Sequence, residues 1–125
     1  MLYRRQDSFR YEFNEQLTGK LQLLQIADKK VTSSIGTMQL YNISPGGLKI
    51  ETTLNFPDPK KQKIILNLSF YLNEEEIERK GEIVWKKILA NRYQYGLIFN
   101  QSDHDKDELI GFLKDFAKRN FRKQL

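Results

Sequence analysis

The sequence predicts a mainly β protein, in which five or six antiparallel strands close into a small barrel followed by one α-helix. Three observations predict this fold. Apolar and polar residues alternate with a period of two in several segments of the range 11–100. Turn-forming residues separate these segments. The apolar period becomes that of a helix only after residue 102, which predicts a helix over 103–122.

The first half of the barrel is predicted from short apolar runs. Phe9, Tyr11 and Phe13 alternate with polar residues and indicate a half-buried strand. A second apolar run covers 21–26, and a turn is expected at 27–30. The next strand is predicted from the β-branched and aromatic residues of 31–41.

A sharp break in the chain is predicted at 42–47, because this segment is dense in turn residues. Alternation resumes at 48–52, which predicts a strand leaving the turn. After a proline-containing loop at 56–59, a strand over 63–71 is nearly apolar on both faces. An acidic turn is expected at 73–76.

The last two strands are predicted over 77–89 and 93–99, joined by a hairpin at 90–92. Strict alternation in the first of them puts four residues on one face: Arg79, Gly81, Ile83 and Trp85. In the second strand, Gly96 indicates a bulge or a close approach of another backbone segment.

The predicted helix has a polar start and an apolar stripe. Ser102 or Asp103 can cap it, and Asp105 with Glu108 has the spacing of a capping box. Asp115 and Arg119 are spaced to pair on its outer side. The stripe should pack on the barrel and consists of Leu109, Leu113, Phe116, Ala117 and Phe121.

Length and composition indicate one soluble domain over 1–125. Of the 125 residues, 39% are apolar and 30% charged, an ordinary balance for a globular protein. There is no cysteine, which excludes a disulfide scaffold and fits a reducing cytoplasm. No apolar run approaches the roughly 20 residues of a membrane span, and the first residues lack the apolar stretch of a signal peptide. We therefore expect a cytoplasmic protein.

The residue types needed for catalysis are scarce. His104 is the only histidine and lies among polar residues at the predicted helix start, where an exposed surface position is expected. With one histidine and no cysteine, no metal site is expected. Phosphate-loop, nucleophile-elbow and dinucleotide motifs do not occur. An enzyme is therefore not expected.

Basic residues gather near both ends of a chain with a net charge of +5. Arg4, Arg5 and Arg10 lie at the start, and the end is enriched in lysine and arginine. Such a distribution favours an anionic partner. Arginine suits phosphates and guanine edges in particular, because its planar fork donates two parallel hydrogen bonds.

The segment 42–47 offers a second candidate binding feature. The side chains of Asn42 and Ser44 either stabilise a turn or point at a ligand. Gly46 and Gly47 allow a close backbone approach or a positive φ.

Together the arginine segment and the Asn-x-Ser-x-x-Gly pattern resemble the signature of the PilZ family. Asn42, Ser44 and Gly47 match its second motif position for position. The segments 81–85 and 95–99 are similar to the family's paired final strands. The resemblance covers nearly the whole chain.

This resemblance implies a six-stranded antiparallel barrel with a C-terminal helix, and cyclic di-GMP as ligand rather than a cofactor. The range 1–10 would be a flexible arm that wraps around the ligand. Arg5 and Arg10 would contact guanines and phosphates, and Arg4 would add charge or stacking. Asn42 and Ser44 would hydrogen-bond the ligand, and the glycines at 46–47 would leave space for it.

The arginine spacing departs from the common family pattern. Four residues separate Arg5 from Arg10, where three are usual. In an extended segment, one extra residue turns a side chain to the other face unless the chain bulges. This leaves open which of Arg4 and Arg5 has the primary role.

Three functions follow from these observations. The first is a cyclic di-GMP receptor or adaptor that passes a conformational change to an unidentified effector protein, with motility and biofilm formation as the family's usual outputs. The second is a PilZ-fold protein-interaction module that does not bind the nucleotide. A nucleic-acid-binding barrel ranks last, because the predicted strands are not notably basic, and no DNA or RNA partner is expected.

Overall fold

The computed structural model describes residues 10–124, apart from the side chains of Asn14 and of 120–124. Seven strands and one helix follow one another along this part of the chain. Their bounds are β1 Tyr11–Ile26, β2 Lys29–Lys30, β3 Gly36–Ser44, β4 Gly47–Thr52, β5 Ile64–Leu72, β6 Glu75–Ile88, β7 Tyr93–Asn100 and α2 Asp103–Gln124.

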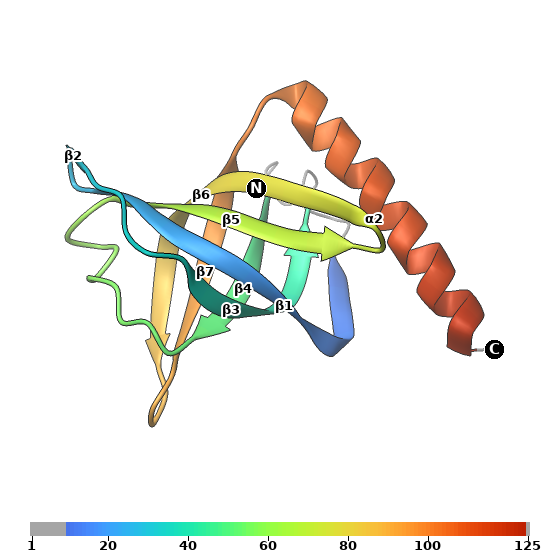
Figure 1. Cartoon of the computed structure of the whole chain (residues 1–125), viewed down its shortest axis with the longest axis horizontal. Helices are drawn as coiled ribbons and strands as arrows, with labels where there is room; N and C mark the ends of the chain where they lie inside the picture. The colour runs from blue at the N-terminus through green and yellow to red at the C-terminus, as the bar shows by residue number, and fades with distance from the viewer. Residues whose placement is uncertain (1–9, 125) are drawn as a thin grey trace.

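Six of these strands close into an antiparallel barrel in the order β1-β3-β4-β7-β6-β5, with β5 pairing back to β1 (Figure 1). Closure depends on the length of β1, which reaches both neighbours. Leu21 of β1 pairs with Gly36 of β3 on one side and with Leu68 of β5 on the other. The short β2 pairs with the end of β1. The predicted six-stranded barrel with a C-terminal helix is therefore confirmed.

One continuous strand, β1, replaces the two separate apolar runs expected near the start of the chain. Its pairing with β3 shifts between Glu12 and Leu17, so the strand bends there without ending. The turn that follows is also shorter than predicted. It consists of Ala27, which has a positive φ of 56°, and Asp28, because Lys29 already pairs with Ile26.

The third strand begins at Gly36, five residues later than the predicted start at residue 31. The preceding segment instead follows β1 without forming a ladder. The Ser33 hydroxyl accepts a hydrogen bond from the Leu23 amide at 2.9 Å, and the Val31 amide donates to the Leu24 carbonyl at 2.9 Å. The ladder between β1 and β3 ends at Leu21 and Gly36, whereas β1 continues to pair with β5 as far as Ile26. The prediction from β-propensity therefore placed the start of β3 too early.

The barrel interior is filled by alternate residues of each strand. β5 shows the pattern clearly: five residues are at most 1% exposed, namely Ile64, Leu66, Leu68, Phe70 and Leu72. The residues between them face outward, and Tyr71 is 56% exposed. Although its sequence is nearly apolar on both faces, β5 therefore has one buried face and one partly exposed face. Tyr95 is the largest fully buried side chain, and its hydroxyl donates to the Leu54 carbonyl at 2.7 Å.

The helix α2 lies along one side of the barrel (Figure 1). Ser102, one of the two predicted caps, accepts a hydrogen bond from the Asp105 amide at 3.1 Å, so the helix begins before the pair Asp105 and Glu108 that has the capping-box spacing. Leu109 and Leu113 are completely buried in the core, as the apolar stripe predicted. The side chain of Phe121 is outside the described part.

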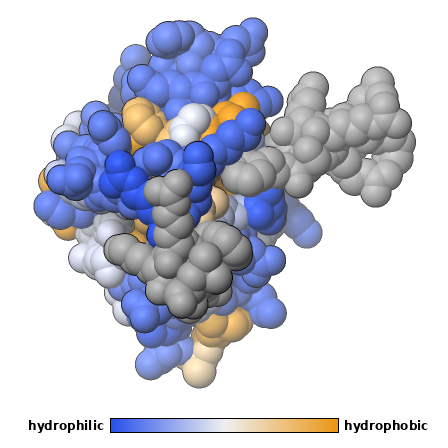
Figure 2. Space-filling view, turned by 90° about the vertical axis from the view of Figure 1, so that its right-hand side faces the viewer, coloured by the Kyte–Doolittle hydropathy of each residue, from blue (hydrophilic) through white to orange (hydrophobic). Residues whose placement is uncertain are grey.

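The outer side of the helix is polar. Asp115 and Arg119 pair there at 3.3 Å, as expected. The face of the molecule seen in Figure 2 is mostly hydrophilic and carries only small apolar patches. Within the described residues, no helix is long and apolar enough to cross a membrane.

Candidate functional site

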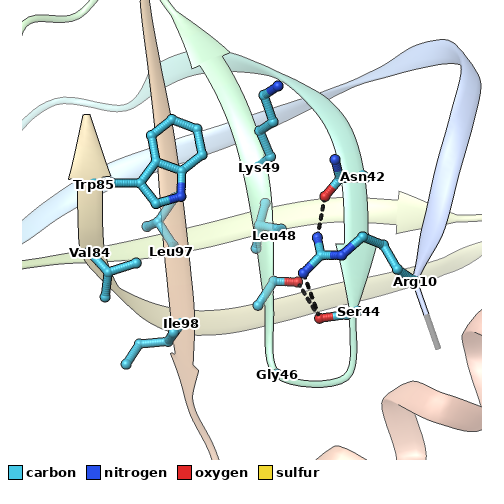
Figure 3. A pocket seen from close by; sticks show the side chains of 12 residues that line it. Arg10, Asn42, Ser44, Gly46, Leu48, Lys49, Val84, Trp85, Leu97 and Ile98 are labelled. Atoms are coloured by element: carbon cyan, nitrogen blue, oxygen red, sulfur yellow. Dashed lines mark hydrogen bonds between the residues drawn. The ribbon is translucent and has the colours of Figure 1, made fainter. Parts of the chain in front are cut away.

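An open hollow of about 360 Å³ lies on the outer face of the barrel, across β3, β4, β7 and β6 (Figure 3). Five of the predicted site residues line it: Arg10, Asn42, Ser44, Gly46 and Gly47. The predicted site residues Arg4 and Arg5 lie outside the described part of the chain. The structure thus gathers, around one hollow, every predicted site residue that it describes.

An irregularity in β3 aims two of these residues at the hollow. The pairing of β3 with β4 shifts between Leu40 and Asn42, which makes Tyr41 the extra residue. Beyond the shift, alternation is regular: Ile43 is completely buried in the core, while Asn42 and Ser44 line the hollow. Two residues apart on a strand, they project from the same face.

The predicted break at 42–47 is accordingly much shorter in the structure. β3 continues to Ser44, β4 begins at Gly47, and only Pro45 and Gly46 form the turn. This end of β3 was not predicted, because Ile43 is the only apolar residue between position 42 and Pro45 and the other residues are typical of turns. Burial of Ile43 in the core keeps this part of the segment extended.

Arg10 extends its guanidinium toward both polar residues of β3 (Figure 3). Nη1 donates a hydrogen bond to Oδ1 of Asn42, and Nη2 lies 3.5 Å from Oγ of Ser44. Arg10 itself is exposed, whereas Ser44 is completely buried. The three side chains therefore form a polar wall that combines a cation with amide and hydroxyl groups.

The two glycines have structural reasons of their own. The Gly46 carbonyl accepts a hydrogen bond from the Phe99 amide at 2.8 Å, which ties the turn to β7. A Cβ atom on Gly47 would lie only 2.1 Å from the carbonyl oxygen of Leu97. Close contact of β4 with β7 thus requires a glycine at position 47, independently of any space that a ligand needs.

The opposite wall of the hollow is apolar and contains Trp85. The pairing of β6 with β7 shifts between Ile83 and Trp85, so Val84 is an extra residue. Trp85 therefore does not share the inward face of Gly81 and Ile83, contrary to the prediction from strict alternation, and is 41% exposed. Its indole covers Gly96, where a Cβ atom would lie 1.9 Å from Nε1. Gly96 is thus closely approached as predicted, but by the side chain of Trp85 rather than by another backbone segment.

This combination of fold and site can be compared with known proteins. The family model described as PilZ domain matches residues 4–115. The chain belongs to the PilZ domain family. No curated protein was found to be significantly similar to it in sequence. PilZ domains are binding modules for cyclic di-GMP and are not catalytic.

Next to the hollow, this PilZ domain has a buried carboxylate. Glu51 is 6% exposed and accepts hydrogen bonds from the Tyr41 hydroxyl at 2.5 Å and the Gln94 amide at 3.2 Å. Arg92 pairs with it at 2.8 Å. The hydrogen bond from Tyr41 is the main cause that lowers the pKa of Glu51, and burial opposes it. The same bond, together with burial, raises the pKa of Tyr41.

The turn of the PilZ domain is also tied to the helix. Gln101 donates to the Pro45 carbonyl at 2.6 Å and accepts from Nε of Arg79 at 3.0 Å. Nη2 of Arg79 reaches the Asp105 carbonyl at 3.1 Å and the Glu108 carboxylate at 3.2 Å. A continuous chain of hydrogen bonds thus runs from the edge of the hollow to the first turns of α2.

Among the lining residues that were not predicted as site residues, four have side chains that are not buried: Lys49, Val84, Trp85 and Ile98. Gly96 was the available signal for Trp85, since a glycine within a strand marks a close approach. The other three carry no signal of this kind, because their outward direction depends on strand pairing across the barrel.

No described histidine, aspartate or glutamate lines the hollow. His104 is exposed at the start of α2, as expected. Among the side chains that the structure describes, no three acidic or histidine residues come together in a way that could hold a metal ion.

Proposed function

We propose that this PilZ domain binds cyclic di-GMP in the hollow on the outer face of the barrel. The observation that carries the proposal is the guanidinium of Arg10, which is directed at Asn42 and Ser44 across the hollow. These residue types match the chemistry of the ligand, which presents two phosphates and two guanine bases.

Each wall of the hollow has a role in this proposal. Arg10 is exposed and offers two parallel donors to a phosphate or to the O6 and N7 atoms of guanine. Asn42 and Ser44 add neutral donors and acceptors that fix the orientation of the ligand. Trp85 offers an aromatic ring on which a base can stack. Arg4 and Arg5 would add further cations from the start of the chain.

We further propose that the domain acts as a cytoplasmic adaptor for an effector protein. Arg10 directly precedes Tyr11, whose ring lies 5.4 Å from that of Phe116 in α2. Phe13 also contacts Phe116, at 5.7 Å. A ligand that moves Arg10 would therefore act next to the contact between β1 and α2. The free energy by which the ligand shifts the equilibrium between two conformations is limited to the difference in its binding free energy for them.

Titration with cyclic di-GMP tests the binding proposal. Trp85 is the only tryptophan of the chain, so its fluorescence reports on the hollow alongside calorimetry. We expect wild-type binding at micromolar or lower concentration, and an affinity at least roughly 10-fold weaker in Arg10→Ala, because a charged hydrogen-bond donor is lost. Exposed Arg119 of α2 provides the matched control Arg119→Ala, which should bind like wild type.

Two results would contradict the proposal. One is the absence of binding in the wild-type protein, which would favour a PilZ-fold interaction module without a nucleotide. The other is unchanged affinity in Arg10→Ala.

A further inference from the structure

Strand register places four outward positions in one row that crosses the hollow from its polar wall to its apolar wall. Asn42 of β3 pairs with Lys49 of β4, Lys49 pairs with Gly96 of β7, and Gly96 pairs with Trp85 of β6. Neighbouring strands lie about 4.8 Å apart. Lys49 is therefore one strand from the amide of Asn42 and one strand from the glycine that the indole covers (Figure 3).

Lys49 makes no direct ion pair with a described acidic residue, although its charge is close enough to Glu51 to help lower the pKa of that carboxyl. Its Nζ lies 5.3 Å from the centre of the Tyr41 ring, a contact that restrains the side chain without neutralising it. The nearby carboxylate of Glu51 already accepts hydrogen bonds from Tyr41 and Gln94 and forms an ion pair with Arg92.

From this arrangement we infer that Lys49 is a ligand-binding residue, which contacts a phosphate of the ligand from the middle of this row. The inference rests on the proposed function and extends it beyond the Arg10, Asn42 and Ser44 wall. A dinucleotide that lies along the row, with a base against Trp85, carries its sugar–phosphate ring over Lys49. Arg10 and Lys49 then supply two cations to a ligand with two phosphates.

A purely structural role of Lys49 makes a different prediction. In that case Lys49 would only support Tyr41 and Glu51, and replacing it would lower the melting temperature without changing the affinity of the folded protein. A phosphate contact instead changes affinity and its dependence on salt, since an ionic contact is weakened by screening.

The test is calorimetric titration with cyclic di-GMP at two salt concentrations, together with thermal unfolding. Lys49→Gln should weaken binding roughly 10-fold and flatten the salt dependence, because a charged donor to phosphate is removed. Lys49→Arg should retain most of the affinity. The matched control is Lys87→Gln: Lys87 is exposed on β6 two residues beyond Trp85, pairs with Gln94, and does not line the hollow.

The outcomes separate this inference from the proposed function. Wild-type binding with unchanged affinity in Lys49→Gln would overturn the role of Lys49 and leave the proposed function standing. An equal loss in Lys87→Gln would also overturn it, since any nearby positive charge would then suffice. No binding by the wild-type protein would refute the proposed function itself.

Discussion

At the scale of single residues, the position of Gly47 illustrates how a binding motif and a packing requirement coincide. The glycine belongs to the Asn-x-Ser-x-x-Gly pattern, yet its nearest constraint is the backbone of β7. A backbone atom cannot move aside as the end of a flexible side chain can. Any side chain at position 47 therefore has to separate β4 from β7, and this would disturb the site and the barrel together.

This packing gives a direct prediction for stability. Gly47→Ala should destabilise the protein by about 1–3 kcal/mol, the usual cost of overpacking, as measured by urea unfolding. Gly111→Ala is the matched control, because an added Cβ there has no neighbour within 4 Å and the position is exposed in α2. It should stabilise by up to ~1 kcal/mol through helix propensity. Equal stability of wild type and Gly47→Ala would refute the packing argument.

At the scale of secondary-structure elements, Arg79 joins β6 to the start of α2. Its side chain is only 11% exposed and donates to Gln101, to the Asp105 carbonyl and to Glu108. An arginine can make these bonds at once because its guanidinium carries five donors in one plane. The start of α2 is thereby fixed relative to both the barrel and the turn at the hollow.

Removing this link should loosen the helix start. Arg79→Ala should lower the free energy of unfolding by about 1–3 kcal/mol, because partly buried acceptors lose their donor. Amide hydrogen exchange in the first turns of α2 should become faster. Arg119→Ala removes an exposed pair and should cost less than ~0.5 kcal/mol. Unchanged exchange in Arg79→Ala would show that Leu109 and Leu113 hold the helix without help.

At the scale of the whole molecule, the Glu51 cluster makes stability depend on pH. Its folded-state pKa lies below the ordinary value. The ionised carboxylate therefore stabilises the fold above the ordinary glutamate pKa of about 4.3. This contribution is lost as the pH falls through the lowered pKa, where the folded state also takes up the proton.

The consequence can be measured by unfolding at pH 7 and at pH 3. Glu51→Gln should be less stable than wild type by about 1–3 kcal/mol at pH 7, because the charged acceptor of Tyr41 and Arg92 is lost. The difference should shrink at pH 3, below the ordinary glutamate pKa, because the unfolded wild-type protein is stabilised there by taking up a proton at Glu51. Glu74→Gln, at an exposed turn position, should differ from wild type by less than ~0.5 kcal/mol at pH 7. A difference that is the same at both pH values would contradict the assignment.

Much of the fold could be predicted because the signals are local. Alternation in the barrel strands, the apolar stripe of α2 and the turn residues each depend on neighbours a few positions away. Predictions failed where the register of pairing with another strand decided the outcome. Trp85 is the clearest case, since the extra residue Val84 reverses its direction. The predicted start of β3 was wrong for the same reason, because the last residues of β1 pair with β5 and not with β3.

The amino-acid sequence by itself determined the barrel, its helix and the residue types of the polar wall: Arg10, Asn42 and Ser44. Only the tertiary structure decided that these face a hollow shared with Lys49 and Trp85. The physical reason is that a one-residue shift between paired strands turns a side chain to the other face of the sheet. The shifts in β3 and β6 are set by pairing with β4 and β7, and closure of the barrel then joins these two hairpins at the hollow, as the pairing of Lys49 with Gly96 illustrates.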